Sequence, residues 1–125
     1  MNVLGIDYGK KRIGLAWVDT ALGVVLPYGR LETGDWRMEL PKLIREEKAD
    51  SVIVGLPIGL DGQENENTKA VRKFVEELKK SIVVPVEFVD ERFTSRQADQ
   101  MGGEVSRDEK AAMLILQSYL DKIKR

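Results

Sequence analysis

Three short apolar segments precede any helical pattern in this sequence. They span residues 2–7, 13–18 and 24–28, and a glycine-containing turn separates the first two. Strand-forming runs joined by a short turn are typical of a β-hairpin, so we predict a hairpin followed by a third strand. Pro27 has no backbone N–H to donate to a neighbouring strand, which favours an edge position for the third strand.

Helices and strands alternate in the next part of the chain. Leu40, Leu43 and Ile44 have helical spacing, although Pro41 predicts that the regular helix begins only just before it. The apolar run at 51–56 is continuous, and it therefore predicts a strand that is covered on both faces.

A second helix and a further strand are predicted after this run. Asn67 or Thr68 is expected to cap the helix. Its apolar residues recur at intervals of three and four positions, and they are Val71, Phe74, Val75 and Leu78. The strand is predicted at 83–89, and Pro85 is expected to weaken or shift its start.

Two helices complete the predicted order. Thr94 or Ser95 is expected to cap a short helix that ends near Gly102. Asp108 is expected to open the last helix, whose apolar face comprises Ala112, Ile115, Leu116, Tyr119 and Ile123. Three meandering strands followed by alternating helices and strands predict one α/β domain over 1–125, with a mixed five-stranded sheet and helices on both faces.

The chain of 125 residues contains neither histidine nor cysteine. Ser-His-Asp triads, thiolate nucleophiles, Cys/His zinc sites and disulfides are therefore excluded. Catalysis must use carboxylates, hydroxyls, lysine, arginine, backbone amides or a metal held by oxygen. No apolar run approaches the roughly 20 residues of a membrane span, and the start MNVLGIDYG lacks signal-peptide features. We therefore expect a cytoplasmic protein with no membrane partner.

The net charge of −1 conceals an uneven distribution. Residues 1–30 carry four basic and two acidic side chains, 31–67 carry four and nine, and 68–125 carry twelve and ten. Positive charge gathers in the run KKR at 10–12. A local surface that attracts phosphate is therefore compatible with the nearly neutral total.

Acidic residues occur where the predicted strands and helices meet loops. Asp7 ends the first strand, Asp90 and Glu91 follow a later one, and Asp108 opens the last helix. Loops at strand ends of an open α/β sheet converge on a crevice, and Mg²⁺ and Mn²⁺ prefer oxygen ligands. The alternative interpretation is structural, with Asp108 favoured by the helix dipole and Asp7 serving as a turn residue.

Four segments, taken together, carry a family resemblance. They read VLGIDYGKKRIGLA at 3–16, VIVGLPIGLDG at 52–62, DERFTS at 90–95 and DEKAAMLILQSY at 108–119. In order and spacing they resemble the signature blocks of the YqgF family, also called RuvX. The resemblance implies a ribonuclease-H-like fold. It also implies a nuclease, either Holliday-junction-resolvase-like or acting on the 5′ end of pre-16S ribosomal RNA.

The same resemblance implies a set of metal ligands. Asp7, Glu91 and Asp108 would hold one or two Mg²⁺ or Mn²⁺ ions as catalytic carboxylates. Asp90 is the competing choice for the second position. Because neighbouring strand residues point to opposite faces of a sheet, only one of the pair is expected to face the metal, and the sequence leaves open which.

Basic residues within the blocks are implied as substrate contacts. Lys11, Arg12 and Arg92 would bind phosphate groups, and Thr94 lies in the same block as Arg92. The alternative for Arg92 is a structural pair with a nearby acid. The loop between Gly103 and Asp108 is short, where relatives often carry a longer, lysine-rich loop, so weaker and less salt-dependent binding is expected.

We therefore expect a metal-dependent phosphodiesterase acting on structured nucleic acid, with pre-16S ribosomal RNA as the main candidate substrate. A Holliday junction resolvase acting on branched DNA is an alternative. A non-catalytic nucleic-acid-binding or ribosome-assembly factor is a second one. Ribosomal particles are a further candidate partner, and both a monomer and a homodimer remain open.

Overall fold

The computed structural model describes residues 1–59, 61–91 and 105–123, without the side chain of Glu91. Five strands form one sheet in the order β3-β2-β1-β4-β5. Strands β1, β2 and β3 form an antiparallel meander, while β4 and β5 run parallel to β1. The mixed five-stranded sheet is therefore confirmed. The strand bounds are β1 Asn2–Tyr8, β2 Arg12–Asp19, β3 Val24–Glu32, β4 Ser51–Pro57 and β5 Val86–Glu91.

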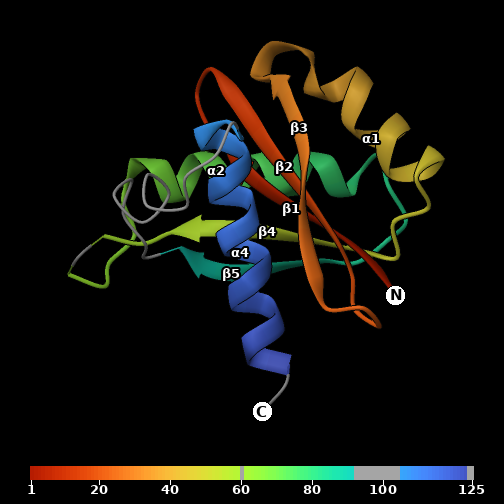
Figure 1. Cartoon of the computed structure of the whole chain (residues 1–125). Helices are drawn as coiled ribbons and strands as arrows, with labels where there is room; N and C mark the ends of the chain where they lie inside the picture. Colours follow the sequence, from red (N-terminus) through yellow and green to blue (C-terminus); the bar gives the residue numbers. More distant parts are fainter. Residues whose placement is uncertain (60, 92–104, 124–125) are drawn as a thin grey trace.

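Helices cover both faces of this sheet, as predicted. One face carries α1 (Trp36–Glu46), which follows the 3-10 turn η1 (Thr33–Asp35), and α2 (Glu66–Lys79). The other face carries α4 (Arg107–Ile123), which lies across the sheet and contacts all five strands (Figure 1). Within the described residues, no helix combines the length and apolarity needed to cross a membrane.

Strand alternation divides the core into two clusters. In β1, Leu4 and Ile6 pack with α1 and α2, whereas Val3 packs with α4. Gly5 lies on the α4 face, where a Cβ would be 2.5 Å from Leu116 Cγ. Successive residues of a strand point to opposite faces, so a strand covered by helices on both sides is apolar at nearly every position.

The start of α1 corrects the prediction drawn from Pro41. The helix begins at Trp36, five residues before the proline, and Pro41 lies inside it. Trp36 is only 3% exposed and meets the Phe74 ring edge-on at a centroid distance of 4.8 Å. Burial of this indole stabilises the first turn, which offsets the backbone hydrogen bond that proline cannot donate.

The cap of α2 is also corrected. Asn65, and not Asn67 or Thr68, caps this helix, because its side chain accepts hydrogen bonds from the backbone N–H groups of those two residues. The Thr68 hydroxyl accepts one in return from the Asn65 N–H. Asparagine is among the best N-cap residues, and the reciprocal pair satisfies two donors that the helix itself leaves unpaired.

Two other strand boundaries differ from the sequence prediction, because β3 continues to Glu32, four residues beyond the predicted end, and β5 continues to Glu91. The expected shift of the start of β5 by Pro85 is confirmed, since the strand begins at Val86. Ile123 is 50% exposed, so its predicted place on the buried face of α4 was wrong, and Leu120, at 1% exposed, is buried instead. The short helix predicted to begin at Thr94 or Ser95 lies outside the described residues.

Candidate functional site

Asp7 lies near the end of β1, in the centre of the sheet. Its partner in the β1–β2 ladder is Gly14, and alternation along β1 places Asp7 on the same face as Gly5, the face that α4 covers. Tyr8 belongs to the opposite face, where its ring stacks on Phe74 at a centroid distance of 4.4 Å. Asp7 thus points to the side of α4, whereas the half-buried ring of Tyr8 packs against the core on the other side.

Gly14 brings the first turn of α4 into contact with the sheet. A Cβ at this position would lie 1.9 Å from the backbone oxygen of Asp108, a separation that no side-chain movement can relieve. The Ser106 hydroxyl accepts a hydrogen bond from Glu109 N–H at 3.2 Å and so caps the helix at this point. Asp108 is therefore fixed over Gly14, beside Asp7, although the two acids are far apart in the sequence.

The carboxylate of Asp108 is held by two arginines. Arg12 Nε donates a hydrogen bond to Asp108 Oδ2 at 3.1 Å, and Arg30 Nη1 lies 3.9 Å from the same oxygen. The Asp108 side chain is 27% exposed. The structure thus gives this acid an ion-pair partner in Arg12, which the sequence presented only as a phosphate contact.

Sequence reasoning missed Arg30. It lies opposite Gly14 in the β2–β3 ladder, just as Asp7 lies opposite Gly14 in the β1–β2 ladder. Arg30, Gly14 and Asp7 therefore form a line across three strands, with the Asp108 backbone seated on its middle member. The sequence prediction ended this strand at Tyr28, whereas β3 continues to Glu32 and so includes Arg30.

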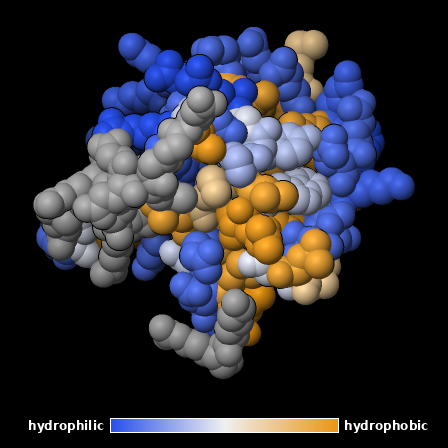
Figure 2. All heavy atoms as spheres, viewed as in Figure 1, coloured by the Kyte–Doolittle hydropathy of each residue, from blue (hydrophilic) through white to orange (hydrophobic). Residues whose placement is uncertain are grey.

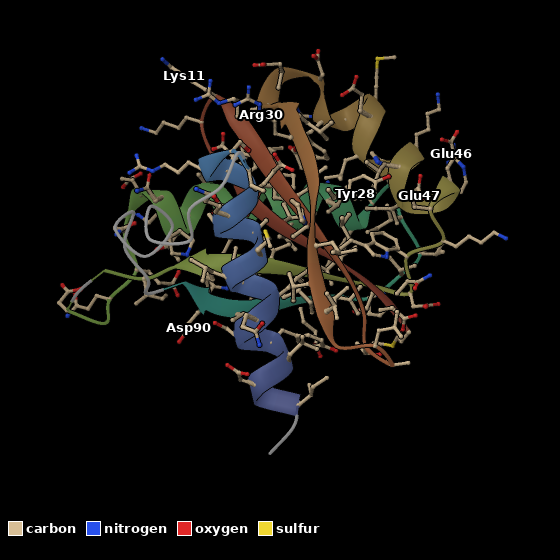
Figure 3. The ribbon with its side chains drawn as sticks, in the orientation of Figure 1. Lys11, Tyr28, Arg30, Glu46, Glu47 and Asp90 are labelled. Atoms are coloured by element: carbon tan, nitrogen blue, oxygen red, sulfur yellow. The ribbon has the colours of Figure 1, made fainter. Side chains whose placement is uncertain are left out.

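The end of β5 carries the two acids between which the sequence left a choice. Val86 and Phe88 pack against the core on the α1 and α2 side, whereas Val89 packs against the cluster beneath α4. By alternation Asp90 shares the face of Val86 and Phe88, which is the face of α1 and α2 and not the face that α4 covers. In Figure 3, Asp90 lies at the end of β5, apart from the labelled Lys11 and Arg30.

A cleft of about 740 Å³ opens at the ends of β1 and β4, beside the start of α2. Its lining residues are Asp7, Tyr8, Gly9, Lys10, Pro57, Glu66, Asn67, Ala70 and Val71. Thr68 is completely buried and its hydroxyl donates to the carbonyl oxygen of Pro57, so it serves the join between strand and helix. The cleft gives a substrate access to the end of β1 that carries Asp7.

The basic loop between β1 and β2 is tied to the end of β3. Thr33 Oγ1 donates to the Gly9 carbonyl oxygen at 2.8 Å, and Thr33 N–H donates to the Lys11 carbonyl oxygen at 3.0 Å. Lys10 and Lys11 are exposed. Hydrophilic residues cover this end of the molecule, whereas hydrophobic residues reach the surface over α4 and β3 (Figure 2). The loop backbone is thus fixed while its cations stay accessible.

The predicted site residues are therefore only partly brought together. Asp7 and the backbone of Asp108 both lie beside Gly14, with Lys11 and Arg12 at the same end of the sheet. Arg92 and Thr94 lie outside the described residues. In the described part of the chain, no three acidic residues are grouped closely enough to hold a metal. The kind of donor fits a hard divalent ion, since Asp7 and Asp108 both offer carboxylate oxygens.

Known proteins resemble this chain over nearly its full length. The RuvX family model, described as Holliday junction resolvase, matches residues 1–122. The "Putative pre-16S rRNA nuclease" of Dictyoglomus turgidum is 38% identical, over 98% of this chain and 96% of its own length. The protein of the same name from Phocaeicola vulgatus is 39% identical, over 98% and 97% respectively.

Two solved structures share the fold at low sequence identity. Thermus thermophilus RuvC in complex with a Holliday junction substrate has a TM-score of 0.71 at 16% identity, over 99% of this chain and 95% of that one. The Fowlpox virus resolvase in complex with junction DNA has a TM-score of 0.67 at 15% identity, over the whole of both chains. The fold is thus the ribonuclease-H-like fold of RuvC-type resolvases, and the chain belongs to the RuvX family.

Proposed function

We propose that this chain is a metal-dependent nuclease that hydrolyses phosphodiester bonds in structured nucleic acid and processes the 5′ end of pre-16S ribosomal RNA. The contact between Gly14 and Asp108 supports this best, because it brings the backbone of an acidic residue of the last helix close to Asp7 on the first strand. The name shared by the relatives, a pre-16S rRNA nuclease, supports the substrate.

The proposed ligands of Mg²⁺ or Mn²⁺ are Asp7, Asp108 and Glu91. We prefer Glu91 to Asp90 because Asp90 lies on the face of Val86 and Phe88, opposite to the face that α4 covers. Strands β1 and β5 are two strand spacings apart, about 10 Å, in the sheet. A bound ion would supply a water of lowered pKa and would stabilise charge on the leaving oxygen.

The chain's own contribution is positioning. Pairing of β1 with β2 fixes Asp7, and the close approach at Gly14 fixes the backbone of Asp108. Lys10 and Lys11, on the loop that Thr33 ties down, would bind substrate phosphates beside the acids. Phosphate contacts of this kind position a nucleic acid without reading its sequence, which is compatible with recognition of a structured RNA.

Asp7→Asn tests the metal-ligand role, because it keeps the size of the side chain and removes its charge. We expect cleavage of an RNA containing the pre-16S 5′ end to fall at least about 100-fold, since even residues that only support a metal ligand affect activity 10- to 100-fold. Asp121→Asn is the control, because Asp121 is exposed at the far end of α4. A folded Asp7→Asn protein with unchanged cleavage would falsify the role.

A Holliday junction resolvase is the second candidate, favoured by the description of the family model. The same preparations assayed on a four-way DNA junction separate the two substrates. In cells, depletion followed by mapping of 16S ribosomal RNA 5′ ends tests the first candidate, with rescue by the unmodified chain and by Asp7→Asn. Equal rescue by both forms would favour a non-catalytic assembly factor instead.

A further inference from the structure

Asp108 sits between two groups of opposite charge. Its backbone rests on Gly14, whose ladder partners are Asp7 on one side and Arg30 on the other. The carboxylate is engaged on the arginine side, by Arg12 Nε at 3.1 Å and Arg30 Nη1 at 3.9 Å. In this position the Asp108 carboxylate pairs with the two arginines. In a different position the same carboxylate would join Asp7 as a ligand of a metal.

A β-bulge directs Arg30 to this place. The β2–β3 register shifts between Leu15 and Ala16, so that Leu15 pairs with Gly29 whereas Ala16 pairs with Pro27. Tyr28 is the extra residue of the bulge, so the later residues of β3 point to the opposite faces of the sheet from those that unbroken alternation would give. Gly29, next to Tyr28, adopts a φ of 131°.

The change of face is visible in the packing on either side of the bulge. Before it, Val25 packs beneath α4, whereas after it Leu31 packs on the opposite side, with α1. Without the bulge, unbroken alternation would put Arg30 on the face of α1. Because of the bulge, Arg30 pairs with Gly14 and meets Asp108 beneath the first turn of α4 (Figure 3).

We propose that Arg30, together with Arg12, is a positioning residue that holds the Asp108 carboxylate away from Asp7 until a phosphate group of the nucleic acid binds the two arginines. This inference rests on the proposed metal site. Guanidinium groups bind phosphate as well as carboxylate, often through two hydrogen bonds, so the phosphate replaces Asp108 at the arginines. The released carboxylate then turns to the metal.

The exposure of the groups permits this exchange. The Arg12, Arg30 and Asp108 side chains are 48%, 53% and 27% exposed, so water screens the pairs and a polyanion can reach both arginines. Exposed ion pairs contribute little individually, and they are therefore readily exchanged. Metal and nucleic acid each gain affinity from the presence of the other, because both favour the same position of Asp108.

Arg30→Gln tests the inference through binding alone. Free Mn²⁺ is counted by electron paramagnetic resonance during titration of the full chain without nucleic acid. We expect Arg30→Gln to bind Mn²⁺ about two- to fivefold more tightly, the factor that loss of one exposed ion pair provides. The same variant is expected to bind a structured RNA more weakly in the presence of a chelator, since a phosphate contact is lost.

Two controls isolate the role of Asp108. Arg37→Gln removes an exposed arginine that pairs with Glu77 on the other face of the sheet, and it should change neither binding constant. In an Asp108→Asn background, Arg30→Gln should lose its effect on Mn²⁺ binding, because no carboxylate remains to be released. An unchanged or lower Mn²⁺ affinity of Arg30→Gln, or an effect that persists with Asp108→Asn, overturns the inference.

Asp7→Asn separates failure of this inference from failure of the metal site. Loss of Mn²⁺ binding in Asp7→Asn without any effect of Arg30→Gln overturns only the role of the arginines. If Asp7→Asn binds Mn²⁺ as the unmodified chain does, or if no form binds Mn²⁺ at millimolar concentration, the metal site is wrong. The inference that rests on it is then wrong as well.

Discussion

The two faces of the sheet are built from residues of different size. On the face of α1 and α2, Tyr8, Phe74 and Trp36 form an aromatic contact chain with ring centroids 4.4 and 4.8 Å apart. On the face of α4, Gly5 and Gly14 let the helix approach the strands closely. Aromatic rings lie between the sheet and the helices α1 and α2, whereas glycines let the backbone of α4 come close to the backbone of the strands.

This difference locates the chemistry. A helix end can place an acid beside a strand residue only where no side chain intervenes, and Gly14 provides that place next to Asp7. The opposite face gains its free energy from buried apolar area, which tolerates imperfect fit better than a backbone contact does. In the proposed function, the face of α1 and α2 mainly stabilises the fold, whereas the face of α4, besides its own buried cluster, positions the acids.

Phe74→Ala should produce the largest loss of stability, because it removes the central ring of the aromatic contacts. A buried Phe→Ala change costs about 3 to 5 kcal/mol through lost burial and the cavity that remains. Urea unfolding at equilibrium measures the loss. Met38→Ala on α1 is the control, since Met38 is 83% exposed and should change the free energy of unfolding by less than about 0.5 kcal/mol.

Gly14→Ala should lower the free energy of unfolding less than Phe74→Ala does, but it should impair metal binding more. The added Cβ meets the Asp108 backbone, so α4 must shift, at a cost of about 1 to 3 kcal/mol typical of overpacking. We expect Mn²⁺ binding to be lost in protein that is still folded, because Asp108 moves away from Asp7. Gly34→Ala is the control, with no atom within 4 Å of its Cβ. Unimpaired Mn²⁺ binding by Gly14→Ala would contradict the division between the two faces.

The predicted sheet is confirmed because it follows from local patterns, and the choice of acids, which stays a prediction, rests on the same patterns. Apolar runs and helical spacing depend on neighbouring residues, and Asp7 and Asp108 stand at the ends of such patterns. The choice between Asp90 and Glu91 stays a prediction. Asp90 is disfavoured by the burial of Val86 and Phe88 on the same face, which only tertiary packing decides.

The parts that were missed depend on pairing between strands. Arg30 reaches Asp108 because a bulge at Tyr28 changes its face, and a bulge is a property of the β2–β3 ladder that the sequence of β3 alone does not specify. Gly14 inside a strand did carry a signal, since glycine there often marks a close backbone approach. The group that approaches Gly14 is the first turn of α4. This turn is far from Gly14 in the sequence, so local patterns could not identify it.

Tyr119→Phe should have the smallest effect on the free energy of unfolding, and this effect should be seen only at alkaline pH. Burial against the α4 face raises the pKa of Tyr119, with a further contribution from the negative charge of Glu87. The neutral phenol is thus favoured in the folded state, whereas in the unfolded state it ionises near pH 10. The contribution of Tyr119 is complete below about pH 10 and is lost as the pH rises through the higher pKa of the folded state.

Thermal unfolding at about pH 8 and pH 11, on either side of the phenol pKa, measures this contribution. Tyr119→Phe should lose less stability between the two than the unmodified chain does, because phenylalanine cannot ionise. Burial also raises the pKa of Tyr28, on the opposite face, with help from the carboxylate of Glu47, so Tyr28→Phe is the matched variant. If Tyr119→Phe and the unmodified chain lose the same stability at alkaline pH, the α4 face does not disfavour the charged phenolate.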